Sequence, residues 1–187
     1  MDSLKPKPLA SEIVPGFFVV VCCICFIYFS QYKSALLGLI TTEKINTLVG
    51  IISGFGMLLL MWFIGAFLDA IRTVWFEVNI FKGIKDEDWD FFFKAPSEAI
   101  EKLEENYYAS YRLDVNLSLS ILLVGIIEAL CLIFGAFSFN VPIGIVDIIL
   151  IIFLIFFLRD GYVLWRDMKR FLKEWRQTKE AITNANK

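Results

Sequence analysis

Two carboxyl groups, those of Glu128 and Asp147, stand inside long apolar stretches and are the residues most able to do chemistry there. A carboxylate near the centre of a bilayer costs about 2.5 kcal/mol or more, so each group needs a partner, a proton or water. At helical spacing, Glu128 shares one face with small and polar residues, and Asp147 shares a face with Gly144. The small and polar residues on the Glu128 face are Ser120, Cys131, Gly135 and Ser138.

This polar stripe has two interpretations. In the functional one, it lines an aqueous path in an oligomer, where Glu128 and Asp147 form rings of negative charge that favour cations. In the structural one, small residues let helices approach and the acids hydrogen-bond across the interface. Direct pairing of Glu128 with Asp147 is the less favoured arrangement, because at ~1.5 Å per residue they lie about 17 and 10 Å from the outer turn.

The composition identifies the kind of protein that must position these acids. The 187 residues are 58% hydrophobic and 20% charged, whereas soluble domains are about 45–50% apolar. This composition predicts a membrane protein and excludes a disordered chain or a basic nucleic-acid binder. Histidine is absent, which removes the commonest general base and metal ligand. We expect no enzymatic activity, no cofactor, no metal site and no nucleic-acid partner.

Four apolar windows are long enough to cross about 30 Å of hydrocarbon as helices, which takes ~20 residues. They are residues 13–29, 48–68, 117–139 and 141–158. Four crossings place both termini and the loop between the second and third spans on one side. Of all the lysines and arginines, only Lys33 and Lys44 lie on the other side. The positive-inside rule therefore predicts an integral, multi-pass membrane protein with cytoplasmic N- and C-termini.

The expected fold is all-α: an integral membrane four-helix protein whose transmembrane helices 2, 3 and 4 extend into a small cytoplasmic helical bundle. Apolar residues continue at helical spacing after the second and fourth spans and before the third, and three such extensions pack most simply against one another. The chain divides into residues 1–68 (transmembrane helices 1 and 2), 69–116 (an acidic cytoplasmic helical loop), 117–158 (a hairpin of transmembrane helices 3 and 4) and 159–187 (a basic amphipathic cytoplasmic tail helix).

Three further groups of residues are candidates for packing, gating and docking. The second span carries glycines on one face, two of them in a G-xxx-G pattern that favours close helix approach: Gly50, Gly54 and Gly65. Polar residues at the inner membrane boundary form a collar that is either a gate or simply a boundary: Asp69, Arg72, Arg112, Asp114 and Asn116. Acidic and aromatic residues in the loop could dock a soluble partner: Asp86, Asp88, Trp89, Phe91 and Phe92.

Two functions fit these features. The first is a homo-oligomeric membrane channel or pore-forming protein gated by its cytoplasmic helical region, such as a membrane-permeabilising effector controlled by a ligand or partner. Several copies are needed because one four-helix protomer has too little volume for a conduit. The alternative is a non-conducting membrane scaffold or accessory subunit that docks a soluble partner through its cytoplasmic loop. The expected partners are the lipid bilayer, further copies of the chain, and a cytoplasmic protein or small-ligand regulator.

Overall fold

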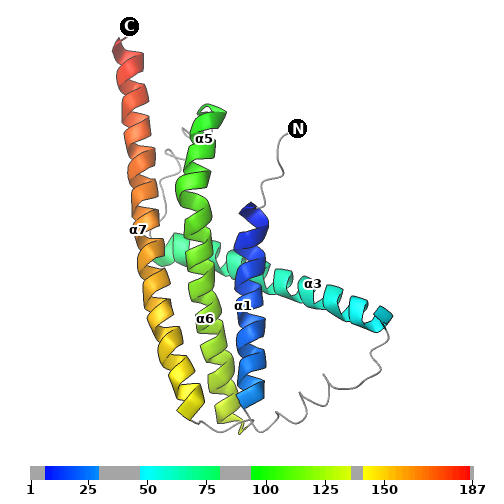
Figure 1. The fold of residues 1–187 in the computed structure, drawn as a ribbon. Coiled ribbons are helices and arrows are strands. Elements are labelled where there is room, and N and C mark those ends of the chain that lie inside the picture. Colours follow the sequence, from blue (N-terminus) through cyan, green and yellow to red (C-terminus); the bar gives the residue numbers. More distant parts are fainter. Residues whose placement is uncertain (1–6, 30–46, 81–93, 136–140, 186–187) are drawn as a thin grey trace.

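The computed structural model describes residues 7–29, 47–80, 94–135 and 141–185, and these are helical apart from short turns (Figure 1). The elements are α1 (Lys7–Phe29), α3 (Thr47–Ile71), its continuation η1 (Arg72–Ile80), α5 (Ser97–Leu103), η2 (Glu104–Tyr108), α6 (Ala109–Ile133) and α7 (Val141–Ala185). The described part of the chain contains no strand, so the predicted all-α class is confirmed.

Three of the described helices are long and apolar enough to cross a membrane. Their candidate spans are Gly54–Glu77, Ala109–Ile133 and Val141–Glu180, and Ile13–Phe26 is a shorter apolar helix. These helices are compatible with the multi-pass membrane protein that the composition predicts. The number of crossings and the side on which the termini lie stay predictions.

α5, η2 and α6 form one rod, and α7 lies along it (Figure 1). The rod begins after Pro96, whose carbonyl accepts a hydrogen bond from the amide of Ala99 at 3.0 Å. It ends at Gly135, which has a φ of 67°. Glycine adopts this left-handed conformation without the strain that a Cβ would bring, and it commonly ends helices.

Aromatic rings join the rod to α7 in the half of the molecule that carries most charges. The rings of Tyr111 and Trp165 have centroids 5.1 Å apart, and those of Tyr107 and Phe171 are 5.9 Å apart. Further down, α7 approaches α6 at Gly161, where a Cβ would lie 2.9 Å from Cγ2 of Val115. Two of the three predicted extensions therefore pack against each other, while the three-part bundle is not confirmed.

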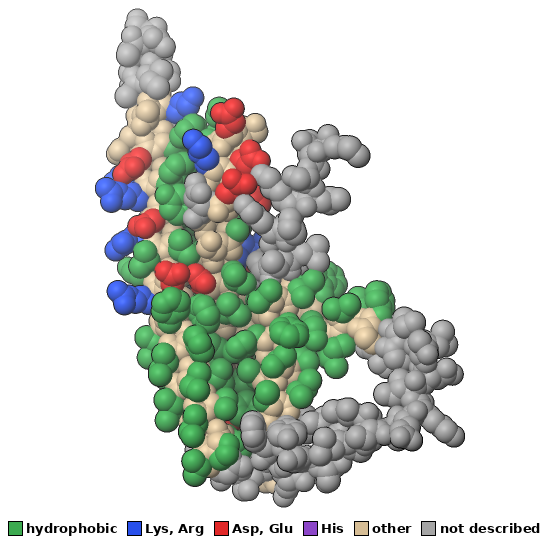
Figure 2. Space-filling view, in the orientation of Figure 1, with side chains coloured by type: hydrophobic (Ala, Val, Ile, Leu, Met, Phe, Trp, Pro, Cys, Tyr) green, Lys and Arg blue, Asp and Glu red, His purple; other side chains and the backbone are tan. Residues whose placement is uncertain are grey.

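The surface is divided along the long axis of the molecule. In Figure 2, charged side chains gather over the end that carries α5 and the C-terminal half of α7, and hydrophobic side chains cover the rest of the visible face. On α7 the apolar part includes Ile148, Ile152 and Phe156, each about 60% exposed. Such a continuous apolar surface is unfavourable in water and suits a lipid environment.

α3 runs across α1 and α6 instead of alongside them (Figure 1). The crossing is very close at Gly16 of α1, where a Cβ would lie 1.8 Å from the carbonyl oxygen of Met61. α3 is apolar on all sides, and Phe63 is 68% exposed. Its sequence therefore has no division into a polar and an apolar face that could have given its direction, and the predicted arrangement of four aligned spans is not confirmed.

The α1–α3 crossing gives a first prediction. Gly16→Ala forces the two backbones apart and should lower the free energy of unfolding by about 1–3 kcal/mol, the usual cost of overpacking. Gly56→Ala is the matched control, because a Cβ on Gly56 meets nothing within 4 Å. Unfolding in detergent micelles, followed by circular dichroism, measures both variants. Equal stability of the two variants would contradict the backbone contact.

Candidate functional site

A cluster of charged and polar side chains joins the end of α3 to α6. We call it the charge cluster and define it as Asp69, Arg72, Glu77, Arg112 and Asn116. Asp69 is its hub: its carboxylate accepts hydrogen bonds from Arg72 Nε at 3.2 Å, from Arg112 Nη2 at 3.0 Å and from Asn116 Nδ2 at 3.0 Å. A second bond, from Arg112 Nε at 3.3 Å, makes the Arg112–Asp69 contact bidentate. This pair holds residues 43 positions apart in a fixed geometry.

Arg72 is the most constrained member of the charge cluster. Its side chain is only 2% exposed and is ion-paired with both Asp69 and Glu77. Arg72 and Glu77 are five residues apart, a spacing that places side chains on different sides of an α-helix. η1 is a π-helical segment, in which hydrogen bonds join residues five apart, and this wider turn brings the two side chains together.

Tyrosine rings extend the charge cluster toward α7. The guanidinium carbon of Arg72 lies 5.8 Å from the ring centroid of Tyr108 and 5.6 Å from that of Tyr111, and Arg112 lies 5.8 Å from Tyr108. Tyr111 is fully buried and packs on Trp165 of α7. The two arginines and two carboxylates cancel in charge, which is the condition for keeping such groups out of water.

Two buried serines of α6 hydrogen-bond within their own helix, and one of them, Ser120, also contacts α1. Ser120 is fully buried, and its hydroxyl lies 3.1 Å from the Pro15 carbonyl of α1 and 2.8 Å from the Asn116 carbonyl. The Ser118 hydroxyl donates to the Asp114 carbonyl at 2.9 Å. Ser120 therefore contributes to the contact between α6 and α1.

Two pairs of carboxyl groups join α6 to α7. The side chain of Asp114 lies close to that of Asp160, and the side chain of Glu128 lies close to that of Asp147. Two carboxylates at such short range would repel each other.

The Glu128–Asp147 pairing differs from the expectation based on depth. α6 ends at Ile133, so Glu128 lies five residues before the end of its helix, while Asp147 lies six residues after the Val141 start of α7. The predicted distance of about 17 Å between Glu128 and the outer turn is too long, because that prediction places the end of the helix at residue 139.

A groove opens beside the Glu128–Asp147 pair, between α6 and α7. It has a volume of about 490 Å³, and its walls are mostly apolar. Gly125 lines it, and a Cβ at that position would meet nothing within 4 Å. The groove thus combines two carboxyl groups with open space.

The other predicted site residues are more scattered. Cys131 is a partly buried free thiol, and Gly135 ends α6 in an exposed position. On α3, Gly65 is buried, whereas Gly54 is exposed and a Cβ there would meet nothing within 4 Å; the surroundings of Gly50 lie outside the described residues. The predicted positions that also lie outside the described residues are Ser138, Asp86, Asp88, Trp89, Phe91 and Phe92. Over the described ranges, no group of three or more Cys, Asp or Glu side chains could hold a metal ion.

Sequence reasoning placed no site role on Glu77, Tyr108 or Gly16. Glu77 stands at a spacing from Arg72 that an α-helical wheel separates, so only the π-helical turn brings them together. The signal that could have pointed to Glu77 is a carboxylate within an apolar helix next to a buried arginine, since each needs an opposite charge.

Comparison of this chain with protein-family models, with curated proteins and with solved structures gave no match. Its function is therefore inferred from its own residues.

The charge cluster gives a second prediction. Arg72→Met removes the arginine that pairs with the partly buried Glu77 and one of the two arginines that pair with Asp69, and should lower the free energy of unfolding by about 3–5 kcal/mol. Arg170→Met is the control: Arg170 pairs with Glu174 at 2.9 Å, but both side chains are more than 60% exposed, so its loss should cost about 1 kcal/mol or less. Denaturant titration in micelles compares the two variants. Similar losses would show that the charge cluster does not stabilise the fold.

Proposed function

We propose that the chain forms a homo-oligomeric membrane channel, in which the Glu128–Asp147 carboxyl pair lines the conducting path. The observation that carries this proposal is the position of the pair in a groove between α6 and α7 that is open to the surface of the protomer. Gly125 and Ile126, which line the groove, are exposed. Carboxyl groups beside a groove that opens on a surface of apolar helices are costly in lipid, and an aqueous axis between several copies would remove that cost.

The charge cluster is the proposed gate. It holds α3 and η1 on α6, and Tyr111 transmits its position to Trp165 of α7. A ligand, lipid or partner protein that favours one arrangement of the charged end would change the angle between α6 and α7, and with it the width of the path. The acidic and aromatic segment of residues 86–92, which could receive a soluble partner, lies outside the described residues.

The proposed orientation places both termini in the cytoplasm, because the charged end of α7 carries a row of exposed arginines and lysines. A thiol introduced by Glu180→Cys, in a variant whose four native cysteines are replaced by alanine, should resist a membrane-impermeant maleimide in intact cells and react after permeabilisation. Labelling of intact cells would reverse the orientation.

Ion flux in liposomes tests the channel. Glu128→Gln and Asp147→Asn each take one carboxyl group out of the pair that attracts cations, and each should reduce potassium flux about tenfold, which corresponds to about 1.4 kcal/mol. Asp167→Asn is the control, because Asp167 lies in the charged half of α7 and pairs with Arg166 at 3.4 Å.

Absence of flux at every protein-to-lipid ratio, or flux indifferent to both substitutions, would contradict the channel. If flux is absent and the chain also stays monomeric, the alternative function, a non-conducting scaffold or accessory subunit, would be favoured.

A further inference from the structure

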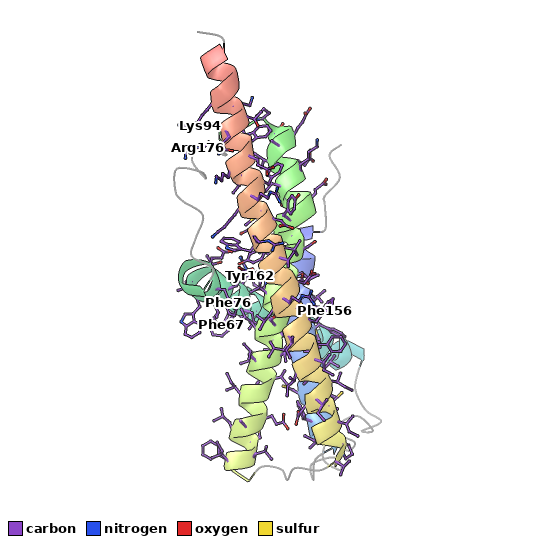
Figure 3. All side chains as sticks on the ribbon, turned by 90° about the vertical axis from the view of Figure 1, so that its left-hand side faces the viewer. Phe67, Phe76, Lys94, Phe156, Tyr162 and Arg176 are labelled. Atoms are coloured by element: carbon purple, nitrogen blue, oxygen red, sulfur yellow. The ribbon has the colours of Figure 1, made fainter. Side chains whose placement is uncertain are left out.

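The groove beside Glu128 has the size and walls of a small-molecule site. Its volume of about 490 Å³ lies in the range of ligand pockets, which are mostly apolar with a few polar groups that fix orientation. Ile121 of α6 and Leu150 and Leu154 of α7 supply apolar walls. In Figure 3, α6 and α7 stand further apart toward their Ile133 and Val141 ends, where the groove lies.

Glu128 brings an unsatisfied requirement to this groove. Its side chain is 7% exposed, and its Oε1 atom is buried and has no hydrogen-bond partner among the described residues. A buried acceptor without a donor costs about 1–3 kcal/mol, and more when it is charged. Asp147 lines the same groove, so a donor placed there would face two carboxyl groups.

The chemistry of the groove selects one class of donor. A bare metal ion gains nothing from leucine and isoleucine walls, and in the described ranges no third ligand stands near the pair. A neutral alcohol could donate a hydrogen bond but would leave the charge uncompensated. An ammonium group supplies up to three donors and a positive charge, and an attached hydrocarbon fills the apolar space.

We propose that this groove binds a protonated amine with a compact apolar body, its ammonium group on Glu128 and Asp147 and its body against the α6 and α7 leucine and isoleucine side chains. The ligand reaches the groove from the bilayer, into which such amines partition. An amine bound to the carboxyl pair would also block ion conduction, and this effect rests on the proposed function, in which the pair lines the conducting path. Binding is measured without flux, so either proposal can fail alone.

The test uses 1-adamantylamine as the probe and 1-adamantanol, which has the same body and no charge, as its neutral counterpart. Equilibrium dialysis against the full chain in lipid nanodiscs, with empty nanodiscs subtracted, should show saturable binding of the amine. Binding of the alcohol should be at least tenfold weaker. Glu128→Gln should weaken amine binding by at least tenfold, and Asp167→Asn should leave it unchanged.

A second variant tests the shape of the site without changing charge. Gly125→Leu places a side chain in the groove, where a Cβ meets nothing within 4 Å, and should abolish binding without a backbone clash. Gly56→Leu, at an equally open position on α3, should retain the affinity of the unmodified chain. The proposal is overturned if the amine does not bind saturably, if the alcohol binds equally well, or if binding survives both Glu128→Gln and Gly125→Leu.

Discussion

The arrangement of the described helices depends on keeping one buried guanidinium paired. Arg72 is almost completely removed from solvent, and a cation in that position is tolerated only while carboxylates surround it. Asp69 comes from the preceding turn and Glu77 from the following one, which requires the chain to widen into a π-helix at Arg72. Asp69 must also reach Arg112, so the same requirement fixes where α3 meets α6.

α6 is the element through which the rest of the structure is connected. One side of it receives α3 through the charge cluster, another receives α1 through the Ser120 hydroxyl, and a third receives α7 through Tyr111 and two carboxyl pairs. These contacts are polar or aromatic within a chain that is otherwise strongly apolar. In lipid, where apolar side chains gain little from meeting one another, such contacts specify which helix faces which.

The sequence was sufficient for features that depend on composition and local pattern. It predicted apolar helices and the long amphipathic continuation of α7. It also placed Asp69, Arg72 and Arg112 in one collar, because hydropathy marks the level at which an apolar helix becomes polar.

The features that the sequence did not predict depend on the direction of a helix and on the position at which a helix ends. α3 presents apolar side chains on every side, so no periodicity distinguishes a helix that lies across its neighbours from one that lies along them. Pairing of Glu128 with Asp147 depends on α6 ending at Ile133, which the left-handed conformation of Gly135 brings about. The residues after Gly135 are mostly hydrophobic, so the sequence does not show this helix end.

α7 is a single helix of 45 residues, about 68 Å long at 1.5 Å per residue. Gly161, where α7 closely approaches Val115 of α6, lies near the middle of that length, so a rotation of α7 about this contact moves its two ends in opposite directions. A tilt of about 5° around this point moves each end by about 3 Å in opposite directions. In a straight helix, a displacement of the charged half is therefore accompanied by an opposite displacement of the apolar half.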